Sequence, residues 1–515
     1  MTYSVVWFKR DLRVFDHETL RLALRAGQVL CVYLVEPSLL AQPDVARQHH
    51  RFAMESVADL RRQLAGVGLS LQVLTGEAVA VFDRLHALSP FAALYSHQET
   101  GNAASFGRDK AVARWCRERR VVWHEPRQQG VVRGPLNRDH WQRQWRALVS
   151  EPCAEAPTRR PAAAQVPLPW TEPSVPSDDA LGLLHDDPPE RQRGGRTEAL
   201  RVLHSFIHDR AVAYRGGISS PLTAPDACSR LSPYLTHGCL SVREVVQACQ
   251  HAWAALPPGR QREGLRAMVG RLAWRDHFIQ KLETQPDIEW RNLHRGYDGL
   301  REGGWNPERF QALMDGCTGW PMVDACVAML RQTGWLNFRM RAMLVSVAAY
   351  PLWLHWREPG HWLARQFLDY EPGIHWSQMQ MQSGTTGINT TRVYNPIKQA
   401  QDHDPSGQFV RHWLPVLQRV PDSWLLQPWR MPPSVQSACG VRLGLDWPEP
   451  LVDLAAATRA AKAALHQRRA LPEVRAARHA IVQQHGSRGH NDRHPAPRRS
   501  PPRAPQSGSQ LGLFD

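Results

Sequence analysis

Charged residues interrupt an apolar stretch between residues 318 and 398. Arg339 and Arg341 lie within an apolar pattern at helical spacing, which is formed by Met340, Met343, Leu344 and Val347. Asp369 and Glu371 follow this pattern. Charges among apolar side chains are costly to bury unless they find partners. We therefore expect an arginine–carboxylate pair beside a bound ligand, with a purely structural ion pair as the alternative.

The same part of the chain is rich in tryptophan. Nine of the 20 tryptophans lie between Trp274 and Trp376. Aromatic rings most often fill a core. The large number of tryptophans here suggests a second function, in which the rings carry electrons or stack on bases.

Residues 228–232, with the sequence CSRLS, begin a further helical pattern. Their hydroxyls and backbone N–H groups would suit a phosphate, because helix N-termini bind anions. A simple helix cap is the alternative.

The chain of 515 residues carries a formal charge of +15, and residues 456–505 hold 11 Lys or Arg against two acids. Such a balance suits a nucleic-acid partner.

The nine cysteines are scattered without a C-x-x-C pair, so neither zinc nor an iron–sulfur cluster is expected. No apolar run is long enough for a membrane span, and charge interrupts the N-terminus where a signal peptide would be apolar. We expect a cytoplasmic protein.

The first 125 residues alternate short apolar runs with amphipathic patterns. The runs are SVVWF, VLCVYLV, LSLQVL, FAALYS and VVWHE, and the helical patterns cover residues 18–25, 52–64, 78–86 and 104–117. This alternation predicts a doubly wound α/β domain with a parallel sheet. No G-x-G-x-x-G follows the first run, so a dinucleotide site of that kind is not expected.

From Arg196 onward helical periodicity dominates, which predicts an all-α second domain. We place the domains at residues 1–130 (α/β), 131–193 (linker), 194–430 (helical), 431–484 (C-terminal extension, with a helix over 451–469) and 485–515 (basic tail).

Several motifs together resemble the cryptochrome/photolyase family, in its bacterial branch without an iron–sulfur cluster. They are VVWFKRDLRVFDHETL (residues 5–20), SRLSPYLTHGCLSVREV (229–245), LAWRDHFIQ (272–280), TGWP (318–321), TGWLNFRMR (333–341), WRE (356–358) and FVRHWLPVL (409–417). The likeness runs in the family's order from about residue 4 to residue 417.

The resemblance implies FAD in the helical domain. The residues that match its binding motifs are Tyr214, Cys228, Ser229, Arg230, Leu231, Ser232, Arg341, Asp369, Tyr370 and Glu371, with cysteine at 228 where the family usually has threonine. It also implies a second, antenna chromophore of folate or deazaflavin type, for which residues 97–102 are the candidate contact. Glu99 in that loop is more simply a solvated acid.

The family's electron relay maps to Trp305 and Trp356. Its flavin-proximal ring falls near Gln378 or Met379, so Trp376 is the nearest indole, and Trp353 offers another path.

The lesion pocket departs from the family pattern. Trp274 is retained and would stack on a flipped base. The other candidate DNA contacts are Arg271, Arg275, Asn337 and Phe338. Cyclobutane-dimer photolyases usually have Glu, Asn and Met where this chain has Arg271, Phe338 and Ala342, and the histidine pair of (6-4) enzymes is missing.

The last residues, QLGLFD, resemble the motif by which bacterial repair proteins bind the sliding clamp. Gln510, Leu511, Leu513 and Phe514 would dock as a tethered peptide. A chance apolar terminus is the alternative.

The leading hypothesis is a photolyase that acts on DNA with UV lesions and splits cyclobutane pyrimidine dimers with blue light. The alternative is a cryptochrome-type photoreceptor, which the altered lesion pocket favours. A flavoprotein that only binds nucleic acid is a third possibility, but it leaves the tryptophans unexplained.

Overall fold

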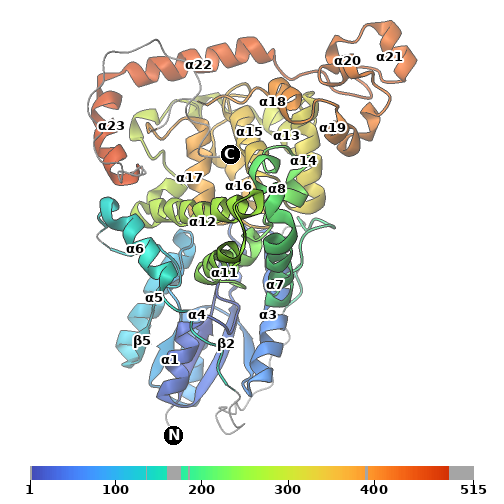
Figure 1. Cartoon of the computed structure of the whole chain (residues 1–515). Coiled ribbons are helices and arrows are strands. Elements are labelled where there is room, and N and C mark those ends of the chain that lie inside the picture. Colours follow the sequence, from blue (N-terminus) through green and yellow to red (C-terminus); the bar gives the residue numbers. More distant parts are fainter. Residues whose placement is uncertain (1–2, 135, 159–175, 184–185, 389–391, 487–515) are drawn as a thin grey trace, which may run out of the picture.

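The computed structural model describes residues 3–134, 136–158, 176–183, 186–388 and 392–486. An α/β domain forms one end of the molecule, and a larger body of helices sits on it (Figure 1). The predicted fold class, an α/β domain followed by an all-α domain, is confirmed.

The α/β domain is built on one five-stranded sheet. Its strands are β1 (Ser4–Phe8), β2 (Val29–Val35), β3 (Leu71–Thr75), β4 (Ala93–Tyr95) and β5 (Val122–His124). They pair in parallel in the order β3-β2-β1-β4-β5. The connecting helices are α1 (Glu18–Ala26), α2 (Pro37–Leu40), α3 (Arg47–Gly66), α4 (Ala78–Leu88) and α5 (Ala103–Arg119). All five predicted apolar runs form strands.

Both faces of this sheet are buried, because alternate strand residues point to opposite sides. Val6 and Phe8 face α1 and α3, in a core that continues into the helical body through Phe206 and Leu272. Residues on the other side of β1, among them Trp7, pack against α4 and α5. The α/β domain and the helical body therefore share one continuous apolar core.

The helical body contains most of the remaining elements. Its helices are α6 (Arg138–Ser150), α7 (Arg196–Ser205), α8 (Ala211–Gly217), α9 (Ala224–Ala227), α10 (Ser232–Thr236), α11 (Val242–Ala255), α12 (Arg260–Thr284), α13 (Pro307–Asp315), α14 (Pro321–Thr333), α15 (Phe338–Ala349), α16 (Arg357–Gln366), α17 (Pro372–Ser383), α18 (Pro396–His403), α19 (Gln408–Trp413), α20 (Asp422–Leu425) and α21 (Pro433–Cys439). A π-helical turn, Phe206–Arg210, joins α7 to α8, and short 3-10 helices lie at Pro286–Glu289, Arg295–Tyr297, Glu302–Gly304, Pro415–Leu417 and Pro428–Arg430.

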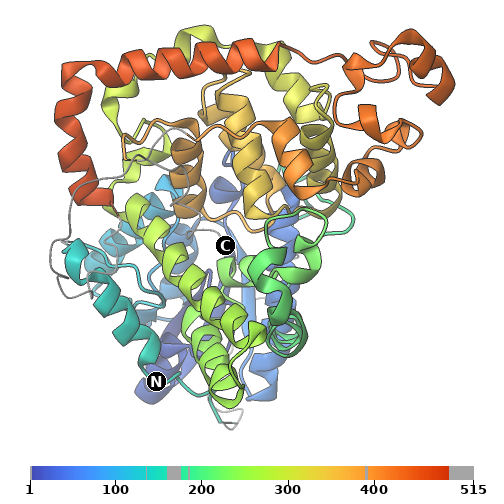
Figure 2. The same ribbon diagram turned by 45° about the horizontal axis from the view of Figure 1, so that its top comes forward.

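The last two helices, α22 (Leu454–Ala470) and α23 (Pro472–His485), wrap the helical body from outside (Figure 2). Leu465 of α22 and Val474 of α23 pack with Tyr297 and Tyr350 in a small core. Asp453 caps α22 by accepting a hydrogen bond from the N–H of Ala456. The helix expected over 451–469 therefore begins three residues later, where a capping side chain is available.

Within the described ranges, no helix combines the length and the apolar character that a membrane crossing needs.

Candidate functional site

Arg341 on α15 and Asp369, which precedes α17, form a two-point ion pair. The Nη1–Oδ1 distance is 2.8 Å and the Nη2–Oδ2 distance is 3.1 Å. The guanidinium also donates from Nε to the Leu336 carbonyl and lies 4.1 Å from the ring centroid of Phe367. Burial opposes ionisation of Asp369, but Arg341 and the Ser232 hydroxyl hold the pKa of that carboxyl below its ordinary value. The structure thus joins Arg341 to Asp369, and brings Ser232 to them.

Residues 228–232 lie among arginines that the helical body gathers from different elements. Arg210, Arg230, Arg271 and Arg341 all act electrostatically on the Cys228 thiol. Arg210, in the π-helical turn, donates to the carbonyls of Cys228 and Ser229, the latter at 3.2 Å. We call these four side chains the arginine cradle.

The arginines of the cradle repel one another. Partial burial, together with Arg341 and Arg210, lowers the pKa of Arg230 to about 10. The Arg230 guanidinium lies 3.9 Å from the ring centroid of Trp335, and its backbone is left-handed, with φ of 60°. A cluster of like charges is favourable only when an anion joins it. The arginine cradle has the charge that a diphosphate needs, whereas the helix that follows, α10, has just five residues and a correspondingly short dipole.

Tyr214 on α8 connects this cradle to α12. Its hydroxyl donates to the sulfur of Met268 at 3.7 Å and is hydrogen-bonded with Arg271. Arg271, predicted as a DNA contact, therefore lies beside a predicted cofactor residue.

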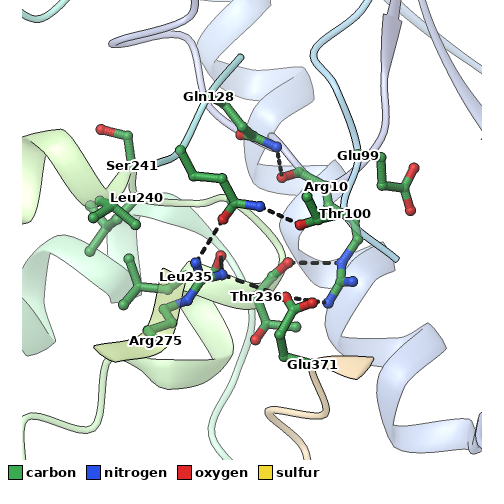
Figure 3. A pocket seen from close by; sticks show the side chains of 13 residues that line it. Arg10, Glu99, Thr100, Gln128, Leu235, Thr236, Leu240, Ser241, Arg275 and Glu371 are labelled. Atoms are coloured by element: carbon green, nitrogen blue, oxygen red, sulfur yellow. Dashed lines mark hydrogen bonds and ion pairs between the residues drawn. The ribbon is translucent and has the colours of Figure 1, made fainter. Parts of the chain in front are cut away.

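Glu371 lines a pocket between the two domains (Figure 3). Its Oε2 is 3.3 Å from Arg10 Nη2 and 3.5 Å from Arg275 Nη2. Its Oε1 is buried without a hydrogen-bond partner among the described residues. Burial raises the pKa of Glu371 in spite of the two arginines.

Tyr370, between these two acids, also points to the α/β domain. Its hydroxyl donates to Asp44 Oδ2 at 2.5 Å, and its carbonyl accepts from Arg10. The structure therefore divides the predicted set: Asp369 joins the arginine cradle, while Tyr370 and Glu371 line the domain interface.

Two of the predicted DNA contacts are internal. Arg275 donates to Gln129 Oε1 at 2.7 Å, in the pocket of Figure 3. Asn337 is 2% exposed and donates to the carbonyls of Ile218 and Ser219. The side chains of Arg275 and Asn337 already make hydrogen bonds inside the protein, which join neighbouring loops and helices.

The other predicted lesion contacts remain partly exposed. Trp274 packs edge-on against His277, with ring centroids 5.1 Å apart, and tilted against Phe278 at 5.9 Å. Phe338 begins α15 and is also half-buried.

Trp356 and Trp376 are in contact inside the helical body. Their ring centroids are 5.8 Å apart with an interplanar angle of 67°. Trp376 is fully buried on α17, between His361 and His375, and the Trp356 indole N–H donates to Asn292.

Trp305 is 39% exposed and packs on Phe310. Its neighbour Gly304 lies against Trp353, since a Cβ added there would be 3.4 Å from the Trp353 ring. Indoles thus extend from the core toward the surface, and Trp353 belongs to that surface region.

Glu99, in the loop after β4, is not the solvated acid that we expected from the sequence. Glu99 is buried, with its side chain only 9% exposed, and pairs with Arg108 at 2.5 Å. Burial opposes its ionisation, but Arg108 and Lys9 lower the pKa of Glu99 to about 2. The loop had no sequence signal for this, because both partners come from other elements.

Asp11, His17 and His97 form a buried cluster beneath the same loop, with ligand-type atoms within 4.8 Å of one another. Asp11 Oδ2 lies 2.7 Å from His97 Nδ1 and 3.1 Å from His17 Nε2. These side chains could hold a metal ion. A hydrogen bond accounts for the distance between Asp11 and His97, whereas the buried His17 Nε2 has no hydrogen-bond partner among the described residues.

Sequence reasoning missed Arg10, Asp44 and Arg210. Arg10 stands in the quoted motif of residues 5–20 and could have been singled out there. Asp44 and Arg210 carry no sequence signal, since their roles come from contacts with Tyr370 and with Cys228 far away in the chain. The clamp-type residues Gln510, Leu511, Leu513 and Phe514 lie outside the described residues.

Two family models match the chain. The model described as DNA photolyase matches residues 4–135, and that described as the FAD binding domain of DNA photolyase matches residues 268–467. The second range includes Arg271, Arg341 and Asp369.

Curated relatives cover nearly the whole chain. A cryptochrome DASH from Gloeobacter violaceus is 30% identical over 475 residues, 87% of this chain and 93% of that protein. A deoxyribodipyrimidine photo-lyase from Vibrio cholerae is 28% identical over 463 residues, 83% of this chain and 93% of that protein. The chain belongs to the cryptochrome/photolyase family.

Solved structures share the fold. A cryptochrome from Synechocystis superposes with a TM-score of 0.80 at 24% identity, over 90% of this chain and 99% of that one. An archaeal photolyase from Sulfolobus tokodaii, solved with two FAD molecules, gives a TM-score of 0.73 at 24% identity, over 90% of this chain and 100% of that one. The family contains both repair enzymes and cryptochromes.

Proposed function

We propose that this protein is a blue-light-dependent photolyase that splits cyclobutane pyrimidine dimers in DNA. The observation that carries the proposal is the arginine cradle, which joins Arg341–Asp369 to residues 228–232 in a chain of the cryptochrome/photolyase family. When bound and reduced, FAD supplies the electron that blue light drives into the dimer.

The residues that would hold FAD fit its chemistry. Arg210, Arg230 and Arg271 offer positive charge for the diphosphate, and Ser229 and Ser232 offer hydroxyls. Tyr214 holds Arg271 in place by its hydrogen bond.

The Arg341–Asp369 pair would face the reactive end of the cofactor. Asp369 holds the guanidinium by two bonds, so its positive charge has a fixed position. A fixed cation stabilises an anionic ring without reorganisation. Glu371, between Arg10 and Arg275, would position the domain interface beneath the site.

Trp274 and Phe338, both half-buried, would contact the flipped bases. We assign Arg275 and Asn337 to positioning roles, because their side chains are internal and already bonded. The formal charge of +15 supports salt-dependent binding of DNA phosphates.

The contact between Trp356 and Trp376 supports an electron relay that returns FAD to its reduced form. It would end near Trp305 or Trp353, at the surface of the helical body.

The test uses the purified protein, reduced under blue light and mixed with an oligothymidylate that carries defined cyclobutane dimers. The recovery of thymine absorbance is followed in light and in darkness. We expect recovery in light alone. Dimers that stay intact while the flavin is photoreduced normally would refute repair. A gain of dimer binding by Arg271→Glu, if the wild type lacks it, would also count against the proposal.

A photoreceptor function is the second candidate, favoured by one contact. Ala461 and Leu465 of α22 pack on Tyr297 and Tyr350, in a core that also includes Trp353. A C-terminal helix seated at the end of the tryptophan chain could report photoreduction by moving. Light-dependent proteolysis within α22, in a protein that repairs no dimers, would support this function.

The clamp-type motif remains a separate proposal about partners. We expect a peptide of residues 506–515 to bind a bacterial sliding clamp, and a peptide with Leu511, Leu513 and Phe514 changed to alanine not to bind. Equal binding of the two peptides would reject the motif.

A further inference from the structure

The α/β domain has a definite place where a second chromophore would bind. In open doubly wound sheets, ligands occupy the crevice beyond the carboxyl ends of the strands, where the strand order reverses. Here the order reverses between β1 and β4. Lys9 follows β1, and the loop containing His97 and Glu99 follows β4, so these residues line that place.

This strand-end crevice is filled by ion pairs. Lys9 Nζ lies 3.4 Å from Asp109 Oδ2 and 3.9 Å from Glu99 Oε2. Arg108 of α5 reaches Glu36, after β2, at 2.9 Å, and also pairs with Glu99 and Asp109. All of these side chains are less than a tenth exposed.

The two cations also occupy the space over an aromatic ring. Lys9 Nζ and the Arg108 guanidinium each lie 4.7 Å from the ring centroid of Trp7 on β1. Cation–π contacts of this kind stabilise the arrangement further.

The buried cluster of Asp11, His17 and His97 adjoins the crevice. The buried Asp11 carboxylate accepts from the N–H of Lys9 at 2.7 Å, is hydrogen-bonded with His97 at 2.7 Å and lies 3.1 Å from His17 Nε2. The backbone at the switch point is therefore held by side chains that a ligand would have to displace.

Among the described residues, the crevice has no spare positive charge for a phosphate. Its cations, Lys9, Arg10, Arg108 and Arg133, all have carboxylate partners, and the carboxylates outnumber them: Glu36, Glu99, Asp109, Glu125, Glu283 and Glu371. A nucleotide would have to break buried pairs, and leaving one partner of such a pair uncompensated is strongly unfavourable.

The network serves instead to join the domains. Arg133 Nε lies 3.2 Å from Glu283 on α12, and Glu289 accepts from the N–H of Ala103 at the start of α5 at 2.8 Å. The edge of the sheet that binds ligands in other α/β folds is here a docking surface for the helical body.

We propose that the strand-end crevice of this protein binds no flavin or other nucleotide chromophore, and that FAD in the helical domain is its single flavin. The protein then harvests blue light through that flavin, without a flavin antenna in the α/β domain. This inference does not depend on whether the protein repairs dimers.

The test is flavin stoichiometry. The full-length protein is dialysed to equilibrium against excess FAD, or against FMN in a parallel arm, and the flavin released on denaturation is counted per chain. We expect at most one FAD and no FMN. Two flavins per chain, or any bound FMN, would overturn the proposal.

A variant locates any flavin that binds. Arg341→Ala removes from the arginine cradle the cation that Asp369 holds by two bonds, and leaves the strand-end crevice unchanged, so we expect its flavin content to fall well below that of the wild type. One flavin per chain retained by this variant would place a flavin elsewhere and overturn the proposal. If the variant does not fold, the stoichiometry of the wild type decides alone.

Discussion

Arg341 shows how much one side chain contributes to the proposed site. It bonds Asp369 at two points and the Leu336 carbonyl at a third, and it stacks on Phe367. A planar guanidinium can make all of these contacts at once, whereas an ammonium cannot.

We predict that Arg341→Lys weakens FAD binding by about tenfold or more, because losing a charged hydrogen bond costs at least about 1.5 kcal/mol. The ratio of flavin to protein after gel filtration measures this loss. Arg331→Lys is the matched control, since Arg331 is half exposed and makes a single 3.4 Å contact with Asp315. Equal flavin retention in the two variants would contradict the role of Arg341.

Lys281, at the end of α12, is a buried cation that lacks the kind of carboxylate partner that Arg341 has. It is 8% exposed, and in the described part of the chain no carboxylate lies within ion-pair distance of its ammonium. Burial, with Arg138 nearby, lowers the pKa of Lys281 to about 7. The unfolded chain, with an ordinary lysine, binds more protons between pH 7 and about 10.5. The buried lysine therefore destabilises the fold at pH 7, and this cost shrinks as the pH rises.

We predict that Lys281→Met raises the free energy of unfolding at pH 7 by on the order of 3 kcal/mol, and by much less at pH 10. Denaturant unfolding at both pH values measures the difference, with the exposed Lys462→Met as control. A loss of stability at pH 7 would mean that Lys281 has an anionic partner.

Helix α17 positions the tryptophan that we expect to pass electrons in the proposed relay. Its N-terminus follows Asp369, and one turn further on it carries Trp376, which meets Trp356 just before α16. The resemblance to the family places its flavin-proximal ring near Gln378 or Met379, which carry no indole, so we expect Trp376 on the same helix to take that role.

Trp376→Phe should slow flavin photoreduction by about tenfold or more, as expected for about 1.4 kcal/mol added to the barrier. The rate of flavin bleaching under blue light with an external reductant measures it. Trp320→Phe is the control, because Trp320 is equally buried in the same core. An unchanged rate in Trp376→Phe, with a slow rate in Trp353→Phe, would place the route through Trp353.

The molecule as a whole is held together by ion pairs and by a shared apolar core. Arg10–Glu371, Arg133–Glu283 and the pairs around Glu99 cross or flank the domain interface. Because these charges are buried, salt screens them little. We expect the two domains to unfold together.

Acid should weaken this interface through Glu99. Its pKa is lowered from 4.5 to about 2, so it contributes stability above pH 4.5 that is lost as the pH falls toward 2. We predict that Glu99→Gln lowers the melting temperature at pH 7, and that the gap to the wild type narrows between pH 5 and pH 3. The exposed Glu118→Gln should behave as the wild type does. A gap that stays constant with pH would exclude ionised Glu99 as the source.

The sequence alone determined the fold class and the elements of the α/β domain. Five apolar runs predicted the five strands, apolar spacing predicted α15, and a helix was expected over 451–469, where α22 lies. These predictions succeed because burial imposes a period of two on strands and of 3.6 on helices, and that period is local. The family motifs also identified Arg341, Asp369 and Ser232, which the structure brings together.

Only the tertiary structure decided which polar groups meet. It placed Asp369 among arginines and turned Tyr370 and Glu371 toward the α/β domain. It recruited Arg210 to residues 228–232 and buried Glu99 in a network of ion pairs. Such contacts join residues far apart in the chain, and they depend on how whole elements pack. No local period in the sequence records that packing, so the partners of a buried charge emerge only when the chain is folded.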